Sequence, residues 1–173
     1  MIEILTNRLM IVPCSLDIAK SLVFHRKELE KRSPIEIPSY WPTSVVRGFI
    51  PYYIESMERM EKEEKDLDCG FWLIILYEQK KIIGDLLMKG KPEKEGEVEL
   101  SYHIDGDNVD ETIAYEAIDA FIDWLTYQQA VKKIIMECEV EHQQTIKLYN
   151  KLGFICKKKD GNFLTWEIQK KGE

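Results

Sequence analysis

Apolar residues recur every three or four positions in three stretches of the chain, which is the spacing of a helix with one buried face. The first stretch follows Ser15, a residue type that caps helix N-termini. The second covers residues 43–65 and ends in a charged run that we interpret as a solvated helix end, and the third covers residues 109–129. The three faces comprise Leu16, Ile18, Ala19, Leu22 and Val23, then Val46, Phe49, Ile50, Tyr53, Ile54 and Met57, then Ile113, Ala117, Ile118, Phe121, Trp124 and Leu125.

Apolar runs of strand length lie around these helices, and turn residues join them, above all Asp160-Gly161, a strong hairpin signal. A predicted helix separates the run 97–104 from the run 133–140, so these two strands should pair in parallel through a right-handed crossover. We expect one α/β domain over residues 1–173, with a mixed sheet of about six to seven strands flanked on both faces by about four helices. The strands are expected at residues 5–12, 71–77, 82–88, 97–104, 133–140, 154–159 and 162–170.

The segment 145–154 is the most informative part of the chain. Leu148, Tyr149 and Leu152 have helical spacing, and Gly153 lies where a left-handed residue ends a helix. An apolar run precedes this short helix and another follows it, so the unit is predicted to be strand, helix, glycine, strand. Taken by itself, this segment favours Tyr149 as a core aromatic residue with its hydroxyl at the surface, since most helix aromatics are packing residues.

Composition narrows the function classes. The 24 Lys and Arg against 31 Asp and Glu give a net charge of -7, which disfavours nucleic acid and anionic membranes as partners and favours a cationic substrate such as an amine. The four cysteines have no CxxC spacing, which indicates free thiols, Cys138 and Cys156 among them buried, and a cytoplasmic location. The N-terminus lacks the pattern of a signal peptide and no apolar run is long enough to cross a membrane. The three histidines and four cysteines lack the spacing of zinc ligands, so no metal is expected.

Several motifs together carry a resemblance to a known family. The strand, short helix with Tyr149, and Gly153-Phe154 resemble the closing pattern of the GNAT acetyltransferase superfamily. The branch that contains the ribosomal-protein N-terminal acetyltransferases is the most similar, because it has counterparts of four further motifs. These are Thr6-Asn7-Arg8-Leu9, Ile82-Ile83-Gly84, Glu99-Leu100-Ser101-Tyr102 with Ser101 in place of glycine, and Ala114-Tyr115-Glu116-Ala117 at the cofactor helix.

The resemblance implies acetyl transfer from acetyl-CoA and assigns candidate residues. Tyr149 is the candidate acid that protonates the departing thiolate, and Glu99 is the candidate base, acting directly or through water. A backbone N–H within Tyr102, His103 and Ile104 would polarise the thioester carbonyl where two parallel strands separate. His142, where the family often has asparagine, and Thr145, in place of serine, are further cofactor contacts. We interpret the side chains of His25 and His103 as polar-face groups.

The expected pyrophosphate loop departs from the family. Relatives have an Arg-Gly-x-Gly pattern where this chain has Val109, Asp110, Glu111 and Thr112, followed by Ile113 and Ala114 at the start of the cofactor helix. Glycines let backbone N–H groups approach phosphates, whereas acids repel them. Asn108 and Glu111 have the spacing of a capping box, so the helix is expected to cap itself where relatives bind phosphate.

Three functions remain open on the sequence. The first is an acetyl-CoA-dependent N-acetyltransferase acting on a peptide N-terminus or a small amine, and the second is a binding or regulatory protein that retained the fold and lost the cofactor. The third is an acyltransferase with a different donor. The sequence also leaves the oligomeric state open, a homodimer included, and does not identify the acceptor, whose walls are expected from the region 34–53.

Overall fold

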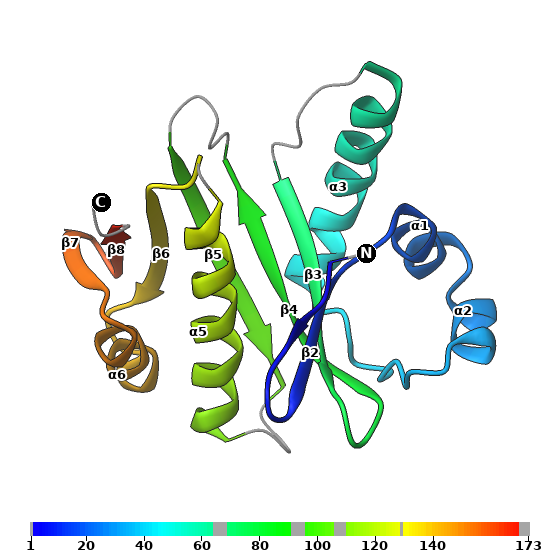
Figure 1. The fold of residues 1–173 in the computed structure, drawn as a ribbon, viewed down its shortest axis with the longest axis horizontal. Helices are drawn as coiled ribbons and strands as arrows, with labels where there is room; N and C mark the ends of the chain where they lie inside the picture. The colour runs from blue at the N-terminus through cyan, green and yellow to red at the C-terminus, as the bar shows by residue number, and fades with distance from the viewer. Residues whose placement is uncertain (1, 64–68, 91–95, 106–109, 129, 170–173) are drawn as a thin grey trace.

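The computed structural model describes the chain except for residues 1, 64–68, 91–95, 106–109, 129 and 170–173. The described strands form one mixed sheet of eight in the order β1-β2-β3-β4-β5-β6-β8-β7, with helices on both faces (Figure 1). The strands are β1 (Ile4–Leu5), β2 (Leu9–Pro13), β3 (Cys69–Leu76), β4 (Lys81–Lys89), β5 (Glu97–Ile104), β6 (Lys133–Glu139), β7 (Ile155–Asp160) and β8 (Phe163–Gln169). The helices are α1 (Leu16–Phe24), α2 (Arg26–Arg32), α3 (Ser44–Glu63), α5 (Glu111–Tyr127) and α6 (Gln143–Leu152).

The predicted α/β class and the main pairings are confirmed. β3 and β4 form an antiparallel hairpin, β5 and β6 pair in parallel around the α5 crossover, and β7 and β8 form the last hairpin. Ser15 caps α1 by accepting the Ile18 N–H, and Gly153 ends α6 with φ at 93°, as the sequence predicts.

Three details differ from prediction for local reasons. The single first strand is two short strands, because the chain turns back where the Thr6 hydroxyl bonds to the Leu9 backbone. α2 was not predicted, since it is mostly charged and buries only Leu29. The Cys156 thiol is exposed, because β7 is an edge strand on which every residue is exposed; Cys14, Cys69 and Cys138 are buried free thiols.

The two faces of the sheet carry separate apolar cores. α5 and α6 pack on one face, where Phe121, Ile118 and Tyr149 join side chains from β2 to β8. α1, α2 and α3 cover the other face around Phe71 and Trp41 (Figure 1). None of the described helices has the length and apolar content needed to cross a membrane. Both faces of the sheet are therefore covered by helices, and a cavity lies at one end of β5 and β6.

Gly84 allows β4 to approach β5 at this end. A Cβ at Gly84 would collide with the carbonyl oxygen of His103, a backbone atom that cannot turn away. We expect Gly84→Ala to destabilise the protein by about 1–3 kcal/mol, the usual cost of forcing a methyl group into a packed site. Gly48→Ala is the matched control, because Gly48 is helical and has nothing within 4 Å of its Cβ position. Thermal denaturation of both variants checks this, and equal melting temperatures would contradict it.

Glu116 ties the N-terminal strands to α5. Its carboxylate accepts hydrogen bonds from the Thr6 hydroxyl at 2.6 Å, the Arg8 backbone N–H at 2.9 Å and the Arg8 Nε at 2.7 Å. Burial alone would raise the pKa of Glu116, but these bonds outweigh it and the pKa lies below its ordinary value. The family motifs Thr6-Asn7-Arg8-Leu9 and Ala114-Tyr115-Glu116-Ala117 therefore contact each other.

This arrangement predicts acid sensitivity. A carboxylate with a lowered folded-state pKa contributes stability that is present above the unfolded pKa, about 4.3 for Glu, and is lost as the pH falls through the folded value. We expect Glu116→Gln to lower the melting temperature at pH 7 and to flatten its decline between pH 5 and 3. Glu111→Gln, one turn earlier and exposed, should leave that decline unchanged. A decline in Glu116→Gln as steep as in the parent would contradict this assignment.

Candidate functional site

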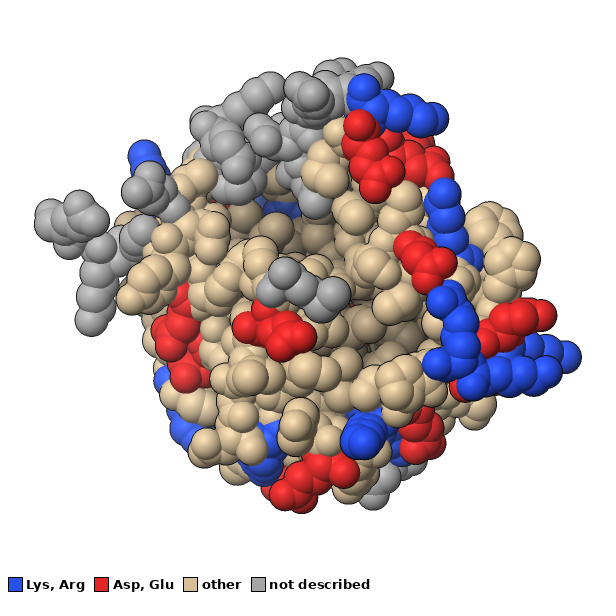
Figure 2. Space-filling model, turned by 45° about the vertical axis from the view of Figure 1, so that its right-hand side comes forward, with Lys and Arg blue, Asp and Glu red and all other residues tan. Residues whose placement is uncertain are grey.

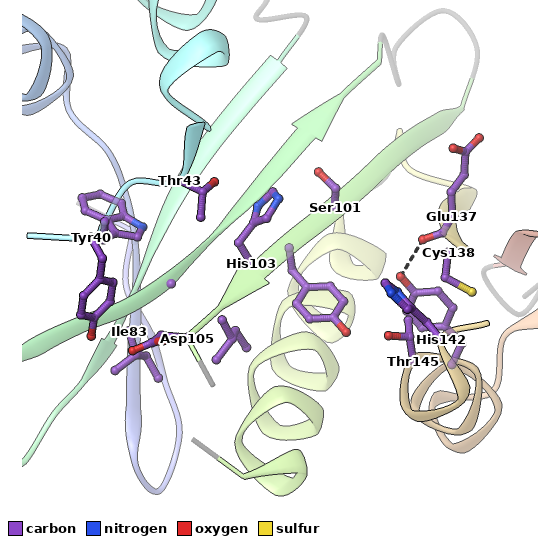
Figure 3. A pocket seen from close by; sticks show the side chains of 15 residues that line it. Tyr40, Thr43, Ile83, Ser101, His103, Asp105, Glu137, Cys138, His142 and Thr145 are labelled. Atoms are coloured by element: carbon purple, nitrogen blue, oxygen red, sulfur yellow. Dashed lines mark hydrogen bonds between the residues drawn. The ribbon is translucent and has the colours of Figure 1, made fainter. Parts of the chain in front are cut away.

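The central strands β5 and β6 separate after a short stretch of pairing. Pairing covers only Glu97–Glu99 against Lys133–Ile135, after which β5 follows β4 and β6 follows β8. A cavity of about 510 Å³ lies where the strands diverge (Figure 3). Its lining residues are Tyr40, Trp41, Thr43, Ile83, Gly84, Ser101, Tyr102, His103, Ile104, Asp105, Glu137, Cys138, His142, Thr145 and Tyr149.

Tyr149 reaches this cavity from α6. Its ring is 2% exposed and packs beside Phe154 and Trp166, with centroid separations of 5.7 and 5.8 Å. Its hydroxyl donates a hydrogen bond to the Glu137 carbonyl at 3.0 Å (Figure 3). Burial raises the pKa of Tyr149, and the neighbouring Tyr102, Cys138 and Glu137 add to the shift. The phenol is therefore protonated at neutral pH and has a proton to give to the departing sulfur.

Three other predicted contacts meet Tyr149 at the cavity. His142 and Thr145 come from the start of α6 (Figure 3), and Tyr102 comes from β5. Burial raises the pKa of Tyr102, and the nearby Thr145 side chain partly offsets this shift, so a polar group of α6 lies beside β5. The backbone of β5 from Ser101 to Ile104 borders the cavity, which is consistent with the predicted carbonyl-polarising N–H in this stretch.

Glu99 lies outside the described lining of the cavity. It is exposed, pairs with Lys89 on β4, and lies on the same face of β5 as Ser101 and His103 because side chains alternate along a strand. Its role as a base stays a prediction.

The sequence did not reveal a buried polar cluster beside the cavity. Asp85 on β4 is 0% exposed, and its carboxylate accepts hydrogen bonds from Trp41 Nε1 at 2.9 Å and contacts His103 Nδ1 at 3.1 Å. Arg26 holds the Trp41 segment in place by donating to the carbonyls of Trp41 and Pro38. The available signal was Asp85 itself, a lone carboxylate in the apolar run 82–88.

A second cavity of about 300 Å³ lies between the start of α5 and α6. Four residues border both cavities, so the two volumes adjoin: Tyr102, Ile104, Asp105 and Thr145. The acidic members of its lining are Asp105, Asp110 and Glu111, and the basic members are Lys147 and Lys151 from α6. The lining also includes Thr112, Ala114, Tyr115, Gln144 and Leu148. Lys151 Nζ lies 4.5 Å from the centre of the Tyr115 ring.

The start of α5 caps itself, although not with the predicted pair. Asp110 is the N-cap, and its carboxylate accepts the N–H groups of Thr112 at 3.0 Å and Ile113 at 3.2 Å. The predicted Asn108–Glu111 capping pair is wrong, because the helix begins at Glu111; Asn108 and the predicted contact Val109 lie outside the described residues. The Thr112 hydroxyl also bonds to Asp110, and these bonds lower the pKa of Asp110. Two backbone N–H groups that could otherwise bind an anion, those of Thr112 and Ile113, therefore already donate to Asp110.

Comparison with known proteins agrees with this architecture. An uncharacterized N-acetyltransferase of Bacillus subtilis (strain 168), YjdG, is 24% identical over 166 residues, 96% of this chain and 97% of the relative. The ribosomal-protein-S5-alanine acetyltransferase of Vibrio fischeri has the same fold, with a TM-score of 0.68, 14% identity and coverage of 99% and 98%. The ribosomal L7/L12 alpha-N-protein acetyltransferase RimL, in complex with coenzyme A, has a TM-score of 0.66 at 12% identity over 97% and 98%. A model of the acetyltransferase (GNAT) domain matches residues 8–155, and the chain belongs to this family.

Proposed function

We propose that this protein transfers an acetyl group from acetyl-CoA to a primary amine, either a peptide N-terminus or a small amine. The observation that supports this proposal most strongly is the protonated, buried hydroxyl of Tyr149 at a cavity between two diverging strands. Acetyl-CoA supplies an activated acyl group and a thiolate leaving group. An amine nucleophile then requires a group that removes its proton, and the thiolate requires a group that supplies one.

The two adjoining cavities suit an extended thioester cofactor. The edges of β5 and β6 that face the gap are free of mutual pairing beyond Glu99 and Ile135 in the described chain, so their amides can bond to the amide groups of a pantetheine arm. Lys147 and Lys151 bring positive charge to the second cavity, where a pyrophosphate would lie. Asp110 opposes the phosphates, so we expect weaker cofactor binding than at a glycine loop.

The acceptor side favours a cationic amine. Asp105, Glu137 and the hydroxyl of Tyr40 border the first cavity, and its described lining includes neither Lys nor Arg. The Asp105 carboxylate near Tyr40 raises the pKa of Tyr40, and Lys81 partly offsets this shift. Carboxylates and aromatic rings together stabilise an ammonium group before it loses its proton. On the face drawn in Figure 2, the described Asp and Glu side chains lie among Lys and Arg side chains. The described part of this face therefore has no extended basic patch that would bind an anionic partner.

Calorimetric titration with acetyl-CoA, followed by mass spectrometry of products from a panel of polyamines, amino acids and N-terminal peptides, tests the proposal. Micromolar binding and an acetylated product whose mass rises by one acetyl group would support it.

A second candidate is a binding protein without transferase activity, which the self-capped start of α5 favours. Absence of binding at millimolar acetyl-CoA would support that candidate. A thermal shift with another acyl-CoA but not acetyl-CoA would indicate a different donor.

A further inference from the structure

We propose that His103, oriented by the buried carboxylate of Asp85, is the general base that removes the proton from the acceptor amine. This inference rests on the proposed function, and it assigns the base to a pair of residues on adjacent strands. Asp85 and His103 are direct partners in the antiparallel register of β4 and β5, and their side chains approach to 3.1 Å.

The hydrogen bonds of Asp85 determine which nitrogen of His103 is free. A carboxylate only accepts hydrogen bonds, so Nδ1 of His103 carries the proton that faces Asp85 Oδ1. The other oxygen, Oδ2, accepts from Trp41 Nε1 at 2.9 Å. Nε2 of His103 then bears a lone pair and can accept a proton. Trp41 and Asp85 are 4% and 0% exposed, so packing holds the orienting group on both sides.

The position of His103 is suited to an amine that enters beside α3. His103 borders the 510 Å³ cavity and keeps 30% of its side chain exposed, although the carboxylate behind it is fully buried. Figure 3 shows the imidazole standing off β5 between Thr43 and Ser101, whereas the Tyr149 hydroxyl lies across the gap at Glu137. The base on β5 and the acid on α6 therefore approach the cavity from opposite sides, as a transfer between two substrates requires. Glu99 lacks such an orienting partner in the described contacts and lies outside the lining.

The proton balance of the transfer closes with these two groups. The acceptor ammonium gives one proton to Nε2 of His103, and the neutral nitrogen then forms a bond to the acetyl carbon. The carbon–sulfur bond breaks, Tyr149 gives its proton to the sulfur, and the second proton that the nitrogen loses restores Tyr149. His103 releases the first proton to solvent, so the products are the amide, the thiol and one proton. Other titratable groups face the same cavity and contribute to its pH profile. They are Tyr40 and Asp105 near His103, and Tyr102, Glu137, Cys138 and His142 toward β6 and α6.

Kinetics of His103→Gln across pH tests the proposal, with His25→Gln as the matched histidine control and Glu99→Gln as the rival base. We expect kcat/KM of His103→Gln to fall by ~10²-fold or more at neutral pH, with unchanged affinity for acetyl-CoA by calorimetry. The deficit should narrow at high pH, where the amine loses its proton without a base. His25→Gln should retain the parent profile, and Glu99→Gln decides between the two candidate bases. Equal profiles for His103→Gln and the parent, or loss of the acidic limb in Glu99→Gln instead, would overturn the proposal.

A second measurement is independent of turnover. Nitrogen-15 NMR of the free protein should show His103 with the proton on Nδ1, and Asp85→Asn should change that tautomer balance and lower kcat/KM. A proton on Nε2 in the parent would overturn the assignment even if Asp85→Asn fails to fold. A parent protein that binds no acetyl-CoA and acetylates no amine contradicts the proposed function itself, whereas an active parent with an unaffected His103→Gln variant contradicts only the base.

Discussion

Tyr149→Phe should lower kcat by ~10²-fold or more while leaving the fold and the affinity for acetyl-CoA nearly intact. The substitution removes one oxygen atom, and with it the hydrogen bond to the Glu137 carbonyl and the only proton that Tyr149 can give. Because burial raises the pKa of this phenol, it keeps its proton at neutral pH and can give it to the departing sulfur while the two are still in contact. Initial-rate kinetics with the best acceptor from the panel gives the measurement.

Tyr53→Phe is a matched control for this prediction. Tyr53 is another buried phenol that donates to a backbone carbonyl, that of Cys14 at 2.6 Å, and burial raises its pKa too. It lies on α3 in the opposite core, so its loss should cost stability comparable to that of Tyr149→Phe without lowering kcat. Similar turnover in Tyr149→Phe and the parent would remove Tyr149 from the mechanism. Equal losses in both variants would indicate a general effect of destabilisation.

The fold was predictable because its signals are local. Helical spacing, the cap at Ser15, the glycine stop at 153 and the Asp160-Gly161 turn each act within a few residues, and the crossover rule then requires a parallel β5–β6 pair. Tyr149 was identified for the same reason, since its helix and its glycine are adjacent in sequence. Elements without an apolar period, such as α2, gave no comparable signal.

The base candidate illustrates what sequence patterns do not reveal. The register of β4 against β5 brings Asp85 and His103 together. A shift of this register by one residue would separate them, and the sequence pattern does not set the register that closely. The sequence instead drew attention to Glu99, which belongs to a family motif but is exposed outside the cavity lining. The capping residue of α5 was missed by two positions for a related reason, since Asn and Asp are both strong N-caps and both occur in this segment.

The self-capped start of α5 leads to the last prediction. Asp110→Asn should tighten acetyl-CoA binding on the order of tenfold at low salt, because it removes a negative charge from the cavity where the phosphates are expected. Asparagine caps helices about as well as aspartate, so stability should change little. Asp110→Ala should tighten binding as well, because it also frees the N–H groups of Thr112 and Ile113, but it should lower the melting temperature.

Charge and capping can therefore be separated within one position. Glu111→Gln removes a neighbouring charge without altering the bonds of Asp110, so it should tighten binding less than Asp110→Asn. The gain in Asp110→Asn should shrink as salt is added, because mobile ions screen exposed charges beyond about 10 Å at 0.1 M. Calorimetry at two salt concentrations and thermal denaturation provide both readings. If Asp110→Asn stays folded and binds acetyl-CoA no better than the parent, the phosphates do not lie at the start of α5. If neither the parent nor any of the three variants binds acetyl-CoA, the result would favour a binding protein that does not use the cofactor. Removing the negative charges would then have revealed no phosphate site.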